Sequence, residues 1–110
     1  MSATDRELLE LAARAAGLRV KFEEVHGCYW IELGQGIPID VWNPLDHDGD
    51  ALRLAMATKV IFDMQDHLGS LIFEEGPQPS FEQAVRRAIV RAAAAIAAAQ
   101  QTQGGGDATD

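Results

Sequence analysis

The densest set of ligand-type side chains in the sequence is Asp46-His47-Asp48-Gly49-Asp50. Its three alternating carboxylates match the first ligands of an EF-hand calcium loop. That loop also requires a glycine at its sixth position and a bidentate acid at its twelfth, where this chain has Ala51 and Ala57. The sequence therefore predicts no calcium loop. We interpret Asp48 as the N-cap of a following helix, with a weak adventitious cation site as the alternative.

Other side chains capable of chemistry are scattered. The three histidines stand beside expected turns without metal-ligand spacing, and only their convergence in the fold would make a metal site. The single Cys28 lies in an apolar run, which favours a half-buried strand position over a reactive thiol. No serine lies in GxSxG, and Gly34-Gln35-Gly36 starts a GxGxxG pattern that lacks its third glycine. The sequence therefore predicts no catalytic residue, metal or cofactor. The histidines are His26, His47 and His67.

Two kinds of side chain are candidates for binding a partner. Trp30 and Trp42 are the largest apolar groups, and in a small domain both are expected in the core. Trp42 stands next to the acidic segment, and an exposed tryptophan there would be a good interface anchor. The arginines Arg86, Arg87 and Arg91 would bind phosphate or an acidic partner, but a solvated helix face is the expected role.

Acidic residues are concentrated in the middle of the chain. Residues 23–79 hold eleven acids against Arg53 and Lys59, a net charge of −9 in a chain whose total is −8. This charge repels phosphate backbones and attracts basic partners at a salt-dependent rate. We therefore expect a basic protein partner and no direct binding to nucleic acid. The predicted partner-binding residues are Trp42, Asp46, Asp48, Asp50, Asp63, Glu74 and Glu75.

Length and composition are those of one globular domain. The chain has 110 residues, of which 47% are apolar, and it can bury enough surface to fold without a disulfide or metal. It shows no signal-peptide pattern and no apolar run approaching the length of a membrane span. We therefore expect a protein of the cytoplasm that does not bind membranes.

The first elements expected are a helix and a sheet. Thr4-Asp5-Arg6-Glu7 matches a capping box, and Gly17 suits the left-handed residue that ends a helix. From Leu18 the apolar spacing changes to alternation, which predicts strands. Pro38 has no amide to donate, so it is expected at a sheet edge or a strand start. The strands are predicted over residues 18–23, 28–33 and 37–41.

Two further helices are predicted. One covers residues 48–58. The other begins at the capping box Ser80-Phe81-Glu82-Gln83, after a stiff linker at 76–79, and ends near residue 101, before Gly104-Gly105-Gly106. Their buried sides are expected to hold Leu52, Leu54, Ala55 and Met56 in the first and Phe81, Val85, Ala88, Ile89, Ala92 and Ile96 in the second.

The segment between these helices has two interpretations. Apolar and polar residues alternate from Val60, which favours a strand over 60–65 paired through a turn at 66–69 with a second strand over 71–75. The alternative is that the preceding helix continues through Val60-Ile61 without a break.

The order of these elements predicts the fold class. Short connections favour antiparallel neighbours, and amphipathic helices must cover apolar sheet faces. We expect an α+β fold in which an antiparallel sheet of four to five strands is covered by helices, as an α/β sandwich. Residues 1–103 would form this single domain, followed by a disordered tail at 104–110.

Parts of the sequence also resemble a known family. They are Glu7–Ala12, Trp42–Leu45 with Asp48–Ala55, and the alanine-rich Ala88–Ala94. Together they resemble the phage ABA-sandwich domain family, small bacteriophage and prophage proteins of unknown function. The chain departs from the family pattern after Thr58, where the family has a turn with glycine. The resemblance implies a phage or prophage protein in a bacterial cytoplasm, and it implies no catalytic residue.

Three functions follow as hypotheses. The first is a non-enzymatic accessory protein that binds a host protein through an acidic surface, such as an inhibitor of an antiviral defence complex of the CRISPR type. The second is a minor virion or assembly component, and a homodimer remains an open possibility. The third is an enzyme whose site is assembled from scattered residues such as His47, Asp48 and Asp63.

Overall fold

The computed structural model describes residues 2–33, 36–63, 69–75 and 80–108. Within these ranges the fold is α+β, with four α-helices and one antiparallel sheet of three strands in the order β1-β2-β3. The elements are α1 (Ala3–Ala15), β1 (Val20–Glu23), β2 (Cys28–Leu33), β3 (Ile37–Trp42), α2 (Asp48–Ala57), the 3-10 helix η2 (Val60–Asp63), α3 (Gly69–Glu75) and α4 (Phe81–Ala108).

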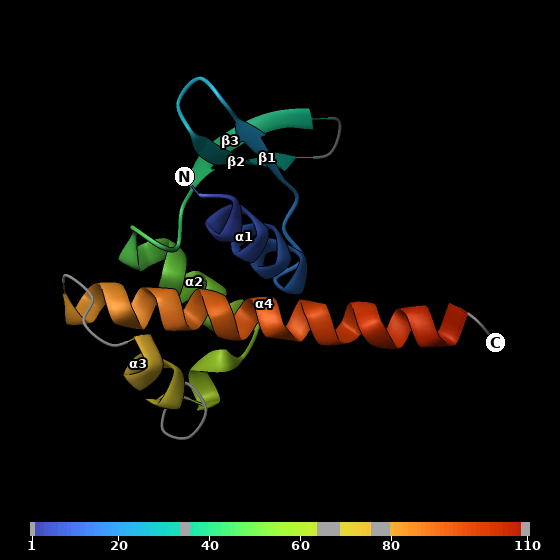
Figure 1. The fold of residues 1–110 in the computed structure, drawn as a ribbon. Helices are drawn as coiled ribbons and strands as arrows, with labels where there is room; N and C mark the ends of the chain where they lie inside the picture. The colour runs from blue at the N-terminus through green and yellow to red at the C-terminus, as the bar shows by residue number, and fades with distance from the viewer. Residues whose placement is uncertain (1, 34–35, 64–68, 76–79, 109–110) are drawn as a thin grey trace.

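Helix α1 lies at the centre of the molecule, between the sheet and α4 (Figure 1). Helix α2 lies beside the N-terminal half of α4, and α3 and η2 lie on the side of α4 that faces away from the sheet. The contact between α1 and α4 is made largely by buried alanines such as Ala12, Ala88 and Ala93. Because these side chains are small, the two helices can approach closely.

The helix-end signals at α1 are confirmed at its C terminus and shifted at its N terminus. Gly17 has a φ of +74°, and Leu18 donates its amide to the oxygen of Ala13, which forms a Schellman motif. At the start, the hydroxyl of Ser2 accepts the amide of Asp5 at 3.1 Å. Thr4 therefore lies inside the helix, and the predicted N-cap is wrong by two residues.

The sheet agrees with the first three predicted strands. Strand β2 pairs with β1 and β3, and β3 is an edge strand, which confirms the edge position expected for Pro38. Pro38 lies opposite Glu32, next to a register shift between Ile31 and Glu32. Such an irregularity accommodates a residue that has no amide to donate.

One face of the sheet packs against α1. Tyr29 lies on this face with 1% of its surface exposed, and its hydroxyl donates to Oε2 of Glu10 at 2.5 Å. The ring of Phe22 meets that of Tyr29 edge-on at 5.1 Å, and the guanidinium of Arg6 lies 3.9 Å above the Phe22 ring. Aromatic packing and a cation–π contact thus join the sheet to α1.

The predicted hairpin in the second half of the chain is wrong. Residues 60–63 form the 3-10 helix η2 and residues 71–75 belong to α3, so the sheet has three described strands rather than four to five. The neighbours Val60 and Ile61 both pack on the core, as do Leu71 and Ile72. A strand would send such neighbours to opposite faces, whereas a helical turn places them on one side.

The alternative of an unbroken helix is also wrong. Helix α2 ends at Ala57, and Lys59 takes a φ of +65°, the conformation that glycine usually supplies. The chain thus makes the break after Thr58 without a glycine. Of the turn predicted at 66–69, Gly69 is instead the first residue of α3, whereas residues 66–68 and the linker at 76–79 lie outside the described residues.

Helix α4 starts where the sequence predicts and ends later. The hydroxyl of Ser80 accepts the amide of Gln83 at 3.1 Å, as expected of a cap. The helix then runs to Ala108, through the three glycines at which we expected it to end. Glycine keeps its amide donor, so it does not block a helix as proline does. Each glycine lowers helix stability by about 1 kcal/mol relative to alanine. The last turns of α4 extend beyond the other elements (Figure 1). The disorder that the sequence predicts for the tail at 104–110 stays a prediction.

Candidate functional site

Trp42, the predicted interface anchor, is a core residue. It lies opposite Tyr29, on the sheet face that α1 covers, and only 2% of its surface is exposed. The hypothesis of an exposed anchor at this position is therefore wrong, and the expectation of a core tryptophan is confirmed.

Trp30 takes the opposite face of the sheet because strand neighbours alternate. It is half-buried, and its Nε1 donates to Oε2 of Glu23 at 2.7 Å. His26 also hydrogen-bonds to Glu23. These contacts, chiefly the one with His26, lower the pKa of Glu23.

Asp50 has a structural role. It is buried, its Oδ2 accepts the amide of Asn43 at 2.9 Å, and its Oδ1 accepts Nη2 of Arg53 at 2.7 Å. It therefore joins the start of α2 to the loop after β3. Asp46 in that loop is exposed and accepts the side-chain amide of Asn43 at 2.9 Å.

Asp48 is not the N-cap that we expected. His47 occupies that position without a side-chain cap, and Asp48 is the first residue of α2. Its carboxylate pairs with Arg86 of α4 at 2.7 Å. A long arginine from a neighbouring element is here the better partner for the carboxylate.

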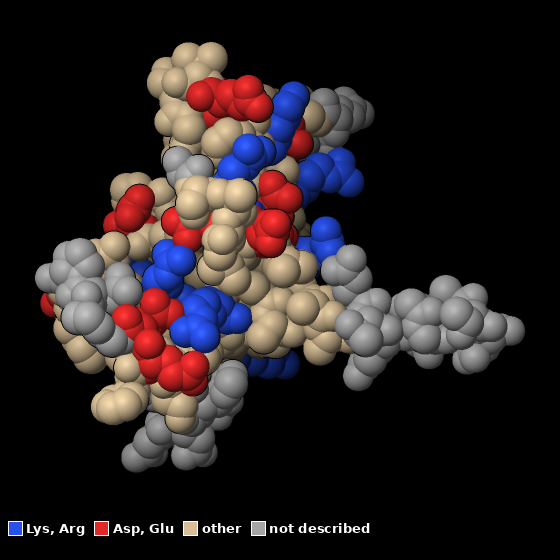
Figure 2. All heavy atoms as spheres, viewed as in Figure 1, with Lys and Arg blue, Asp and Glu red and all other residues tan. Residues whose placement is uncertain are grey.

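The arginines of α4 are not a solvated face, and this expectation is wrong. Arg86 binds Asp48 and the Leu45 carbonyl, Arg87 binds Asp5 at 2.7 Å, and Arg91 binds Glu75 at 2.6 Å. We call Arg86, Arg87 and Arg91 the arginine row. It connects α4 by charge to α1, α2 and α3, and Figure 2 shows basic and acidic side chains next to one another on one face of the molecule.

The arginine row changes the predicted acidic surface. The side chain of Glu75 is 6% exposed and that of Glu74 is 59% exposed, and both pair with Arg91. The side chain of Asp63 lies outside what the structure describes. Among the predicted acids that the structure describes, Asp50 and Glu75 are covered, so these acids do not form one patch, although Asp46, Asp48 and Glu74 remain at the surface.

A small polar cleft lies between α1, the turn before β2, the loop after β3 and α4. Its volume is about 250 Å³, and its carboxylates Asp5 and Asp46 are bonded to Arg87 and Asn43. Among the residues described, no three histidine, cysteine or acidic side chains gather as a metal site. The cleft offers hydrogen bonds to a small polar ligand, and its lining has no nucleophile paired with a base.

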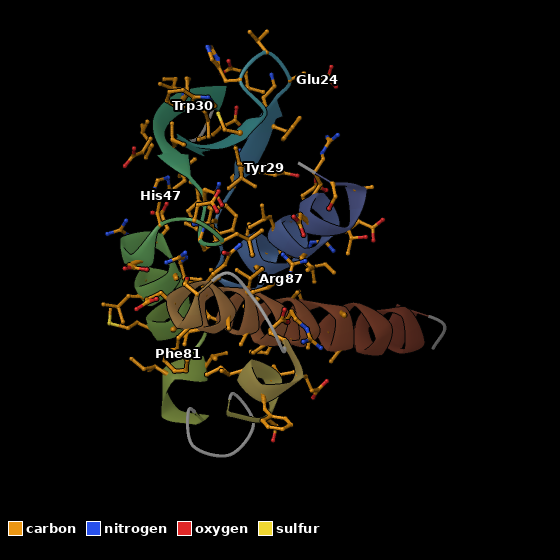
Figure 3. All side chains as sticks on the ribbon, turned by 60° about the vertical axis from the view of Figure 1, so that its left-hand side comes forward. Glu24, Tyr29, Trp30, His47, Phe81 and Arg87 are labelled. Carbon is orange, nitrogen blue, oxygen red and sulfur yellow. The ribbon has the colours of Figure 1, made fainter. Side chains whose placement is uncertain are left out.

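A larger, apolar groove runs between α2 and α4, with a volume of about 420 Å³. We call it the α2–α4 groove. It has Leu52 on one wall and Phe81 on the other, 51% and 70% exposed, and Met56 lies one turn beyond Leu52 and is 52% exposed. Figure 3 shows Phe81 at the start of α4, next to α2. The lining of the α2–α4 groove comprises Asp48, Ala51, Leu52, Ala55, Ile61, Phe81, Glu82, Val85, Arg86 and Ile89.

The exposure of Leu52, Met56 and Phe81 corrects the sequence prediction, which placed all three on buried sides. One signal for α2 was available in the spacing. Ala51, Leu54 and Ala55 form the buried stripe, and Leu52 and Met56 form a second stripe beside it. A helix whose apolar residues cover two stripes has an apolar surface for two contacts.

Comparison with known proteins adds no relative: no protein-family model, curated protein or solved structure matches the chain. The resemblance to the phage ABA-sandwich domain family therefore stays a prediction. Among the described helices, none combines the length and apolar character needed to cross a membrane.

Proposed function

We propose that this protein is a non-enzymatic binding module, a phage or prophage accessory protein that acts by docking on a host protein. The observation that carries the proposal is the α2–α4 groove, where the exposed Leu52 and Phe81 form two walls and the exposed Met56 lies one turn beyond Leu52 on α2. Neighbouring large apolar side chains at the surface of a small domain are typical of protein contact sites. The resemblance to phage proteins supplies the biological setting.

Charge supports a basic partner. The chain carries a net charge of −8, and the exposed acids Asp46, Asp48 and Glu82 lie in or near the start of the helices that form the groove. Such a surface attracts a protein whose own function requires a basic groove, such as the nucleic-acid channel of a CRISPR-type defence complex. Binding there would block the nucleic acid.

The docking surface that we propose differs from the one drawn from sequence. It keeps Asp46 and Asp48 and adds Leu52, Phe81 and Glu82. It leaves out Trp42 and Asp50, because both are buried. A minor virion or assembly component and an enzyme with an unrecognised site are the alternatives, and no observation favours either over docking.

The test is a pull-down from a bacterial host lysate with the tagged protein, washed at low and high salt. We expect one host protein in stoichiometric amount, and we expect the double variants Leu52→Ala/Phe81→Ala and Asp46→Asn/Asp48→Asn to lose it. The matched control is Ile37→Ala/Ile39→Ala, which truncates two exposed apolar residues of β3. Recovery of the bait alone, or equal loss with the control, would contradict the proposal.

A further inference from the structure

We infer that the α2–α4 groove binds a basic amphipathic α-helix of the partner. This inference rests on the proposed function and names the chemistry of what docks. It is drawn from the spacing of the residues along the groove, from the charges at one end, and from the backbone of its walls.

The spacing of the lining is that of two helix faces. Helix α2 contributes residues 48, 51, 52 and 55, and α4 contributes Phe81 at its start and a set made of residues 82, 85, 86 and 89. Both sets follow the i, i+3, i+4, i+7 pattern of the face that one helix presents to another. Ala51 and Ala55 are small and form the floor, and Leu52 and Phe81 form the walls. A groove of this shape between two helices accommodates a third helix.

The polar residues of the groove are gathered at one end. Asp48 and Glu82 belong to the first turns of α2 and α4, and the pair between Asp48 and Arg86 holds these ends together. Ile89 lines the groove farther along α4, and Ile61 of η2 also lines it. The matching ligand has large apolar side chains on one stripe and a basic side chain at the end that meets Glu82, because Arg86 already pairs with Asp48.

The walls favour a helix over an extended peptide. Both are α-helices, whose backbone amides and carbonyls are bonded within the helix, so an added strand would gain no backbone hydrogen bonds. A helical ligand satisfies its own backbone and brings only side chains. A second copy of this chain would bring the same acids and a further net charge of −8, which opposes pairing.

The test uses a fluorescent synthetic peptide of leucine and lysine with the leucines at helical spacing, and measures its Kd by fluorescence anisotropy. We expect Leu52→Ala and Phe81→Ala each to raise the Kd about tenfold, as for interface anchors. Glu82→Lys should raise it roughly threefold to tenfold at low salt, with less effect at high salt. Matched controls are Ile39→Ala and Glu24→Lys, exposed positions on β3 and in the turn after β1, which should leave the Kd unchanged.

Two control peptides and one measurement on the protein alone complete the test. A peptide with the same residues in scrambled order, and one with glutamate in place of lysine, should both bind at least tenfold more weakly. Equal binding by either, or no binding by the leucine–lysine peptide, overturns the inference. So does a dimer in sedimentation that Phe81→Ala dissociates, because a second copy would then be the occupant.

The outcomes separate this inference from the proposed function. If a host protein is captured and Leu52→Ala/Phe81→Ala leaves its capture unchanged, docking stands and the groove inference fails. If the leucine–lysine peptide binds through Leu52 and Phe81 but no host protein is captured, the groove inference stands and the host-binding proposal fails.

Discussion

Tyr29 is the residue whose chemistry the fold changes most. Its ring is buried between the sheet and α1, and its hydroxyl donates to Glu10. Burial, together with the nearby Glu10 carboxylate, raises the pKa of Tyr29 to about 12. Both effects disfavour the negative phenolate.

This shift can be measured directly, because Tyr29 is the one tyrosine of the chain. The absorbance of tyrosinate should rise with a midpoint at about pH 12 in the folded protein and at about pH 10 in denaturant. Because the folded state holds the proton more tightly, the free energy of unfolding should fall as pH rises through this window.

The variant Tyr29→Phe separates this effect from the titration of other groups. It should lower the free energy of unfolding by about 1 kcal/mol at neutral pH, the usual value for a lost hydrogen bond. In the variant, no tyrosine ionises, so this contribution to the fall in the free energy of unfolding at alkaline pH is absent. The free energies of unfolding of variant and wild type should therefore converge above pH 10. A folded-state midpoint near the ordinary value would show that the hydroxyl is solvated.

At the scale of elements, helix α4 organises the molecule through the arginine row. Its buried alanines pack on α1, and its arginines pair with acids of three other helices. Glu75 is the central acid, because it pairs with Arg91 at 2.6 Å and with Arg87 at 3.4 Å and is almost fully buried. A buried carboxylate shared by two arginines is costly to remove.

We predict that Glu75→Gln lowers the free energy of unfolding by about 1–3 kcal/mol, because two partly buried arginines lose their shared charge. Glu74→Gln is the matched control. Its carboxylate is more than half exposed and lies 3.6 Å from Arg91, so the loss should be at most about 0.5 kcal/mol. Urea denaturation checks both values, and equal losses would mean that burial of Glu75 does not matter.

The edge of the sheet shows a second element-scale feature. The exposed Ile37, Ile39 and Val41 belong to edge strand β3, which places apolar side chains beside an open edge. Pro38 has no amide, and the carboxylate of Asp40 accepts the amide of Val41 at 2.8 Å. These features leave fewer backbone donors for a further strand.

Asp40→Ala should therefore promote self-association through β3, because it frees the amide of Val41 and removes a charge from the edge. We expect a concentration-dependent increase in molecular mass in sedimentation or light scattering, compared with the wild type. Asp46→Ala removes the same charge from an exposed loop position and should not have this effect. An equal increase in both variants would attribute self-association to net charge.

At the scale of the whole molecule, the net charge of −8 is distributed in two ways. Many acids are used within the fold, as partners of arginines or of backbone amides, and they contribute little to a surface patch. The others give the molecule its long-range negative field. In the docking that we propose, this field would raise the rate of encounter with a basic partner, and the apolar walls of the α2–α4 groove would determine how long the partner stays.

Much of the element structure was predictable because its signals are local. Gly17 ends α1, strand β2 has the predicted bounds, α2 begins at Asp48, and Ser80 caps α4. Capping and periodicity depend on residues a few positions apart. The prediction of a hairpin was wrong, because the alternation of apolar and polar residues at 60–64 was too short to distinguish a strand from helical turns that pack on the core.

The candidate site was less predictable, because exposure and charge pairing depend on distant residues. Sequence alone determined an acidic α+β chain of 110 residues, the approximate position of its first helix, its three strands and the starts of α2 and α4. Only the tertiary structure decided that Arg87 meets Asp5, 82 residues away, and Arg86 meets Asp48, 38 residues away. It also decided that Trp42 is covered while Leu52 and Phe81 line an open groove. An apolar side chain is buried only where another element covers it, and that is a property of packing.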